Sequence, residues 1–179
     1  MILRRLLNRL FTLEEINGGE RCPTYLYRWT LFQPRRSKWL WGGFGIYLHN
    51  FVGDDWSRDL HDHPKRFISI GLWGSYLEES APLGHTFQQS VVEPWSSRCV
   101  HCADPAQLHT RFRIYRAPWV RTFAASHIHR LSLISGRPCW TLVIVLRASR
   151  PWGFWHHGFW VPWRQYVNSD AATQSKSCP

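Results

Sequence analysis

Short segments with the character of β-strands, separated by turns, dominate this chain. Residues 110–116 alternate between polar and apolar side chains, which is the pattern of a strand with one buried face. Similar segments are expected at 24–32, 45–52, 119–123, 127–134 and 140–147. Roughly seven to nine short strands without a second helical segment favour an antiparallel sandwich or barrel, so the predicted fold class is all-β.

The composition agrees with a compact β protein. Aromatic residues make up 16% of the 179 residues, with twelve Trp, and charged residues only 19%, which excludes a largely disordered chain. This length suits one domain with one hydrophobic core. We therefore expect a single domain over residues 24–167. Within it, residues 82–107 are rich in Pro, Ser and Gln and are predicted to be a variable loop, and residues 168–179 a disordered tail.

The first residues have a different pattern. Apolar side chains at positions 2, 3, 6, 7, 10 and 11 recur at helical spacing, which predicts a short amphipathic helix within residues 1–16. Arg4, Arg5 and Arg9 interrupt the apolar run, so it lacks the core of a secretory signal. Such a helix can contact an anionic membrane surface, but packing against the barrel is the commoner outcome.

Charge and cysteine content bear on location and partners. No apolar run approaches the roughly 18 residues of a membrane span, and five irregularly spaced Cys argue against a secreted disulfide scaffold, so we expect a cytoplasmic protein. The formal charge is +10, mostly from Arg, which favours an anionic small-molecule substrate. The basic residues are scattered and no reading module is apparent, which argues against nucleic-acid binding.

Two histidines provide the clearest functional signal. His61 and His63 are two residues apart, so in a strand both imidazoles project to the same side. A third ligand must come from another segment, and His127 and His129 have the required character. Imidazole nitrogens suit iron, zinc, copper, nickel and manganese, so the pattern predicts one divalent metal ion without selecting it.

These motifs carry a resemblance to a known family. His61-x-His63 followed after eleven residues by Gly74 matches the first cupin motif, and the later His matches the second. The chain more narrowly resembles a family of small, uncharacterised metal-binding cupins common in bacteriophages and bacteria. The segments that carry this likeness are Leu-His-Asp-His-Pro (60–64), Leu-Trp-Gly-Ser-Tyr-Leu-Glu (72–78), His129-Arg130, Trp-Thr-Leu-Val-Ile (140–144), Trp-Gly-Phe (152–154) and Trp-Val-Pro-Trp-Arg (160–164).

The resemblance implies a fold and a set of ligands. The implied fold is a double-stranded β-helix, the jelly-roll barrel of the cupins, preceded by the short N-terminal helix. The implied ligands are His61, His63 and His129, because the family has His followed by Arg at the third position. His127 would then lie near the mouth or form a hydrogen bond behind His129. Asp62 is expected to face solvent or to pair with an Arg.

One position departs from the cupin pattern. Cupins usually have a Glu four residues after the second His, and Phe67 occupies that position. Two alternatives remain open: three His with water, as in the thiol-oxygenase branch, or Glu78 reaching in from the returning strand. A hairpin centred near Gly74 would bring Glu78 opposite roughly Ile70, so contact with substrate or support of a ligand is the preferred role of Glu78.

The candidate catalytic residues are therefore Glu78 and Tyr76. Tyr47, Arg113 and Arg116 are weaker candidates for lining the cavity. Three functions are consistent with these residues: a non-haem metal oxygenase, for which iron is favoured, a non-oxidative metal-dependent isomerase or lyase, and a non-catalytic binding cupin. As cupins often dimerise, a homodimer is also expected.

Two further signals compete with this interpretation. Cys99 and Cys102, with His101 and His109 nearby, resemble half of a zinc site, but a second Cys pair is missing. The aromatic residues between 152 and 163 could stack bases or sugars, although such a segment more often packs as core.

Overall fold

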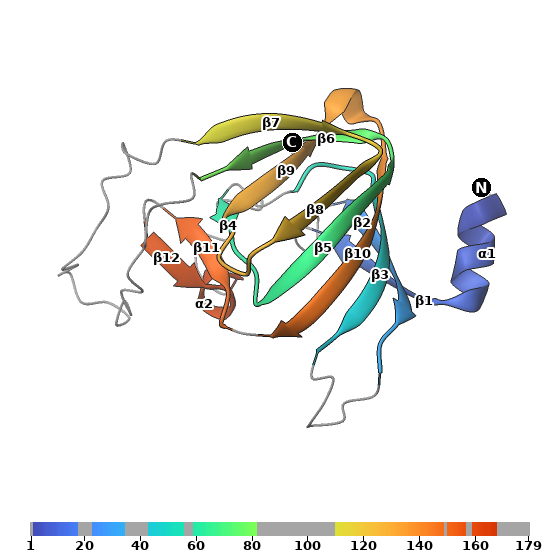
Figure 1. Ribbon diagram of the computed structural model, residues 1–179, viewed down its shortest axis with the longest axis horizontal. Helices are drawn as coiled ribbons and strands as arrows, with labels where there is room; N and C mark the ends of the chain where they lie inside the picture. The colour runs from blue at the N-terminus through green and yellow to red at the C-terminus, as the bar shows by residue number, and fades with distance from the viewer. Residues whose placement is uncertain are drawn as a thin grey trace.

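Two antiparallel sheets of six strands each form the body of the protein (Figure 1). The computed structural model describes residues 2–17, 23–34, 43–55, 59–81, 110–148, 150–156 and 159–167. The first sheet has the order β1-β2-β3-β10-β5-β8, and the second has the order β12-β11-β4-β9-β6-β7. The prediction of a mostly β protein with a short N-terminal helix is confirmed.

The elements follow one another in a simple order. They are α1 (Ile2–Leu10), β1 (Thr12–Asn17), β2 (Thr24–Phe32), β3 (Gly45–Phe51), β4 (Leu60–His61), β5 (Lys65–Trp73), β6 (Ser75–Ser80), β7 (Arg111–Arg116), β8 (Trp119–Phe123), β9 (His129–Leu133), a 3₁₀ turn (Ile134–Gly136), β10 (Cys139–Ala148), β11 (Gly153–His156), β12 (Phe159–Pro162) and α2 (Trp163–Val167).

The register of the first sheet decides which side chains face the second. Ser69 of β5 pairs with Val143 of β10 on one side and with Arg121 of β8 on the other. Arg121 donates a hydrogen bond to Tyr76 of β6, which belongs to the second sheet. Because side chains alternate along a strand, Phe123 and Phe67, two residues from Arg121 and Ser69, share this inner face.

Gly74 is not the centre of a hairpin, and this expectation was wrong. β5 pairs with β10 and β8, whereas β6 pairs with β7 and β9 of the other sheet. Gly74 has φ +87°, and a Cβ there would lie 2.4 Å from the carbonyl oxygen of Pro138. Only glycine fits this turn, which passes the chain from one sheet to the other. Glu78 therefore lies opposite Leu131 and Arg113 and not near Ile70.

The N-terminal helix is shorter than the expected range of 1–16. α1 ends at Leu10, and residues 12–17 form β1, which pairs with β2. The helical spacing of apolar residues stops at Phe11, and the Thr-Leu-Glu-Glu-Ile-Asn segment that follows is fixed by pairing with a long neighbouring strand. Neither of the two described α-helices is long and apolar enough to cross a membrane.

The aromatic C-terminal segment packs on itself and on β4. Phe154 of β11 stacks on Tyr166 of α2 with ring centroids 4.1 Å apart, and Trp152 stacks on Trp163 at 5.7 Å. β11 pairs with β4, so this segment lies beside the strand that carries His61. The loop predicted at 82–107, the Cys99/Cys102 pair, His101, His109 and the tail 168–179 all lie outside the described residues.

Candidate metal centre

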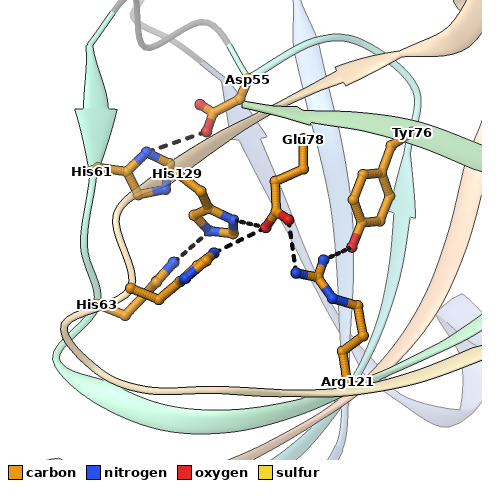
Figure 2. Close-up of polar contacts among 8 residues, drawn as sticks. Asp55, His61, His63, Tyr76, Glu78, Arg121 and His129 are labelled. Carbon is orange, nitrogen blue, oxygen red and sulfur yellow. Dashed lines mark hydrogen bonds and ion pairs between the residues drawn. The ribbon is translucent and has the colours of Figure 1, made fainter. Parts of the chain in front are cut away.

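Three histidine side chains meet on the second sheet (Figure 2). His61 of β4 pairs directly with His129 of β9, and the ligand atoms of His61, His63 and His129 lie within 4.8 Å of one another. The Nε2 atoms of His63 and His129 are 2.8 Å apart. Since a metal–imidazole bond is about 2.0–2.1 Å long, nitrogens at this separation can bind the same ion.

Extended backbone beyond β4 brings His63 to the cluster. β4 ends at His61, but the Asp62 N–H donates to the Gly153 carbonyl and the His63 N–H to the Ala125 carbonyl. These bonds point to opposite sides of the chain, as in a strand. The rings of His61 and His63 consequently lie 5.2 Å apart, on the same side.

Carboxylates lie behind two of the three imidazoles. His129 Nδ1 is 2.8 Å from Glu78 Oε1, and His61 Nδ1 is 3.4 Å from Asp55 Oδ2, a longer contact than an ordinary hydrogen bond. Figure 2 shows both contacts on the side of the rings away from the cluster. Metal-binding histidines usually have such a carboxylate partner, which fixes the ring and directs its other nitrogen toward the metal.

The imidazoles of His63 and His129 are held in their neutral form. Burial is the main cause that lowers the pKa of His129 to about 4; the neighbouring His61 and His127 act in the same direction, and Glu78 opposes the shift. Burial and the charges of neighbouring histidines also lower the pKa of His63. Neutral imidazole is the form that binds metals, so these two side chains are in the form that can accept an ion at neutral pH.

Glu78 is a buried carboxylate with three donors. It is 2% exposed, and its Oε1 lies 2.8 Å from His129 Nδ1 and 3.1 Å from His127 Nε2. Its Oε2 accepts a hydrogen bond from Arg121 Nη2 at 2.7 Å. Burial by itself would raise the pKa of Glu78, but these three donors outweigh it and the pKa lies well below its usual range. Glu78 is therefore ionised.

His127 shares the Glu78 carboxylate with His129. It precedes β9 and, through Glu78, belongs to a second cluster of His127, His129 and Glu78, whose ligand atoms also lie within 4.8 Å of one another. His129 belongs to both clusters, with Nε2 facing His63 and Nδ1 facing Glu78. In this arrangement Glu78 supports His129 and His127 from behind.

Arg121 links Glu78 to Tyr76 and was not anticipated from the sequence. Its Nη1 donates to the Tyr76 hydroxyl at 3.0 Å, and its guanidinium lies over the rings of Tyr115 (3.7 Å) and Phe123 (4.4 Å). Burial raises the pKa of Tyr76, which therefore keeps its proton. The available signal was the alternation Trp119, Arg121, Phe123, which places a cation among inward-facing aromatic rings.

Phe67, at the position of the usual cupin glutamate, forms an apolar wall beside the histidines. Its ring stacks on Phe123 with centroids 4.5 Å apart and meets the His63 ring edge-on at 4.9 Å. This side of the cluster therefore offers an aromatic surface at the position where the cupin motif has a carboxylate.

Asp62 is buried, and the expectation that it faces solvent was wrong. It is 1% exposed, and the alternative expectation of an Arg partner holds: Arg150 Nη1 lies 2.9 Å from Oδ2. Trp160 Nε1 donates to Oδ2 at 3.0 Å, and the Gly153 N–H donates to Oδ1 at 2.8 Å. Burial nevertheless raises the pKa of Asp62 above its usual value. This carboxylate ties the segment between His61 and His63 to the C-terminal hairpin.

The weaker candidates differ in their exposure. Tyr47 pairs with Val143, the partner of Ser69, and so lies on the inner face of the first sheet. Arg113 and Arg116 are exposed in β7.

Comparison with known proteins supports the fold alone. The chain matches no family model and no curated protein. Among solved structures it is similar to the polyketide cyclase RemF from Streptomyces resistomycificus, with 13% identity, a TM-score of 0.50 and coverage of 91% of both chains. It is also similar to FeII HppE, with 6% identity and a TM-score of 0.48 over 75% of this chain. A mutant of Bacillus subtilis oxalate decarboxylase OxdC has 13% identity and a TM-score of 0.48 over 92% of this chain.

These structures are cupin-fold proteins. This chain spans 56% of the HppE chain and 34% of the oxalate decarboxylase chain. The likeness to RemF extends over nearly the full length of both chains. The chain is therefore a mostly β protein of two antiparallel sheets whose structural neighbours have cupin folds, and its His/Glu cluster can hold a metal ion.

Proposed function

We propose that this protein binds one divalent metal ion through His61, His63 and His129 and acts as a non-haem metal oxygenase on a small anionic substrate. The observation that carries the proposal is the convergence of three imidazoles, with 2.8 Å between two Nε2 atoms and a carboxylate behind each of two rings. A divalent ion held by these three residues would have room for a substrate and would supply Lewis-acid or oxygen-activating chemistry.

The charges around the cluster support an anionic substrate. Three neutral imidazoles leave the charge of a divalent ion uncompensated by its own ligands. The buried carboxylates nearby are already paired, Glu78 with Arg121 and Asp62 with Arg150, so they neutralise little of it. The Asp55 carboxylate beside His61 offsets one unit of the ion's positive charge. The remaining positive charge favours an anion at the open positions.

The protein residues have separate roles in this proposal. Glu78 holds His129 and His127 in place, and Arg121 holds Glu78 and the Tyr76 hydroxyl. Since Arg121 donates to the oxygen of Tyr76, the phenolic hydrogen is left to be donated to a substrate oxygen. Phe67 and Phe123 exclude water from one side of the cluster. Iron is the metal that the three-histidine likeness to the thiol-oxygenase branch favours, and imidazole ligands suit it.

A non-oxidative reaction is the second candidate, and one contact favours it. His127 Nε2 lies 3.1 Å from the ionised Glu78, the arrangement of a base and the group that orients it. With the metal as Lewis acid, His127 would move a proton in an isomerase or lyase reaction.

Metal content tests the proposal. Wild type, purified without added metal or a His tag, is compared by elemental analysis with His61→Ala/His63→Ala and with His49→Phe, which changes a partly buried histidine on β3. We expect about one iron per chain in wild type and in His49→Phe, and no bound metal in the double variant. Metal retained by the double variant would remove the proposed site.

Oxygen consumption then separates the two candidates. Iron-loaded protein is screened with small carboxylates and thiols in an oxygen electrode, and the zinc and manganese forms are screened for turnover under anaerobic conditions. Oxygen uptake that requires iron supports the oxygenase, whereas anaerobic turnover with zinc or manganese supports the second candidate.

A further inference from the structure

Helix α1 contacts the first sheet through two polar side chains, Arg4 and Asn8. Arg4 lies over the ring of Tyr27 at 3.6 Å, and Asn8 Oδ1 accepts a hydrogen bond from Trp29 Nε1 at 2.7 Å. Trp29 itself is fully buried, so this bond is a fixed part of the fold. Leu7 is the one leucine of α1 that is buried.

The other three leucines form a stripe on the outside. Leu3, Leu6 and Leu10 are 57%, 51% and 64% exposed, and their spacing of three and four residues aligns them along one face of the helix. The contacts of Arg4 and Asn8 prevent the helix from turning this face toward the sheet. Exposed apolar stripes of this kind mark interaction sites.

Cations border the stripe. Arg5 and Arg9 are both exposed, and at 100° per residue Arg9 lies 60° from Leu6 around the helix axis, with Arg5 beyond it. The helix sequence Ile-Leu-Arg-Arg-Leu-Leu-Asn-Arg-Leu contains no acidic residue. The outward surface of α1 is thus an apolar stripe with a cationic edge.

This combination fits an anionic lipid surface better than other partners. A nucleic acid would pair with the arginines but offers no apolar phase for the leucines. A second copy of α1 would bring like charges together, and a nine-residue helix is only about 14 Å long, far too short for an interface of about 1,200 Å² or more. At a bilayer, the leucines enter the acyl boundary while the arginines meet anionic headgroups.

We propose that α1 is a peripheral membrane anchor, with Leu3, Leu6 and Leu10 inserted at the surface of an anionic phospholipid bilayer and Arg5 and Arg9 paired with headgroups. The proposal does not depend on the metal centre, which lies on the other sheet. It places the metal-binding domain at a membrane surface, where an amphiphilic or membrane-derived substrate would be accessible.

Vesicle co-sedimentation of the full chain tests this anchor. The probes are vesicles of phosphatidylcholine alone and of phosphatidylcholine mixed with phosphatidylserine. We expect binding to the mixed vesicles only, weakened at high salt and about fivefold weaker for each arginine removed in Arg5→Gln and Arg9→Gln. Leu3→Gln/Leu6→Gln/Leu10→Gln should lose binding. Gln is chosen because its helix propensity is close to that of Leu.

The matched control removes exposed leucines elsewhere. Leu72→Gln/Leu146→Gln changes residues that are 50% and 37% exposed on β5 and β10, and its binding should equal that of wild type. Equal binding to both kinds of vesicle, no binding to either, or equal loss in this control would overturn the proposal.

Light scattering provides the remaining check. If the wild type is a dimer without vesicles and the triple leucine variant is a monomer, the stripe is a contact between copies and the proposal fails. Should the triple variant not fold, as judged by circular dichroism, the two arginine variants carry the test. Vesicle binding that they leave unchanged would then overturn it.

Discussion

His129 and Glu78 lie in neighbouring strands, β9 and β6, with Nδ1 and Oε1 2.8 Å apart and both side chains almost fully buried. Because Glu78 is ionised and can only accept, the proton of this hydrogen bond must be on Nδ1. The lone pair of His129 is then on Nε2, which faces His63. One carboxylate thus sets the tautomer in which His129 can bind a metal ion.

Glu78→Gln should weaken metal binding without abolishing it. The amide keeps the shape of the side chain but loses the charge that fixes His129, and loss of such a supporting group typically lowers affinity or activity by about 10- to 100-fold. We expect one metal per chain at saturation, lower affinity in a chelator competition, and a larger loss of activity than of metal content. The matched control is Glu79→Gln, next in sequence and paired with Arg130. A variant without any metal at saturation would make Glu78 a direct ligand.

Asp62→Ala should destabilise the protein by about 3 kcal/mol, because it leaves the donors of Trp160, Gly153 and Arg150 without their buried acceptor. Urea denaturation of the apo protein measures the change. Asp54→Ala is a suitable comparison, since its hydrogen bond to the Leu133 N–H lies at an exposed site and its loss should cost less. If the two variants lose equal stability, Asp62 does not have the structural role described above.

Phe67→Glu introduces a carboxylate at the position where the cupin motif has one, and it should couple metal binding to stability. Loss of the ring that packs on Phe123 and His63 should cost the apo protein about 3 kcal/mol. Added metal should then raise the melting temperature more than in wild type, because a fourth ligand binds the ion in the folded state only. Phe67→Gln introduces a side chain of the same size as Glu but without its charge. It should show the same loss of apo stability, without the larger metal-dependent rise in melting temperature. An equal response of both variants to metal would exclude ligation by residue 67.

Acid should destabilise the protein in part through His49, a residue outside the metal centre. Burial, with a smaller effect of Arg28, lowers the pKa of His49 to about 3. The unfolded chain therefore binds more protons at this residue between about pH 6.5 and pH 3, so its contribution to stability is full above pH 6.5 and is lost as pH falls toward 3.

The measurement is the urea midpoint at pH 7 and at pH 5. The midpoint should fall with pH in wild type and fall less in His49→Phe, which fits beside Tyr47 and Phe51. Equal falls in both proteins would show that His49 is not the group responsible.

Local sequence patterns were sufficient to predict most strands, and also the two segments that carry the histidine cluster, one with His61 and His63 and the other with His129. The segments at 24–32 and 119–123 coincide with β2 and β8, because short runs rich in aromatic and β-branched residues favour strands. The His61/His63 pair could be identified for the same reason, since two residues that share a face need no tertiary information.

What the sequence did not predict depends on pairing between distant segments. The environment of Glu78 follows from the crossing of the chain between sheets at Gly74, which looks like a hairpin turn when only local residues are considered. Arg121 reads as a surface cation until β8 is placed opposite β6, and the burial of Asp62 depends on residues 150–160. The environments of Glu78, Arg121 and Asp62 are all fixed by contacts between residues that are far apart in the sequence, so a local sequence pattern does not reveal them.

The partners of Asp62 also have a consequence for the order of assembly. Gly153 and Trp160 follow Asp62 by 91 and 98 residues, whereas His129 follows His63 by 66. Contacts between segments so far apart form late, since the intervening chain must first be closed into a loop. A ribosome that has released only the first 140 residues has exposed all three histidines, but not the hairpin that orients two of them. We therefore expect the nascent chain to acquire its metal near the end of synthesis, when the fold closes around the site.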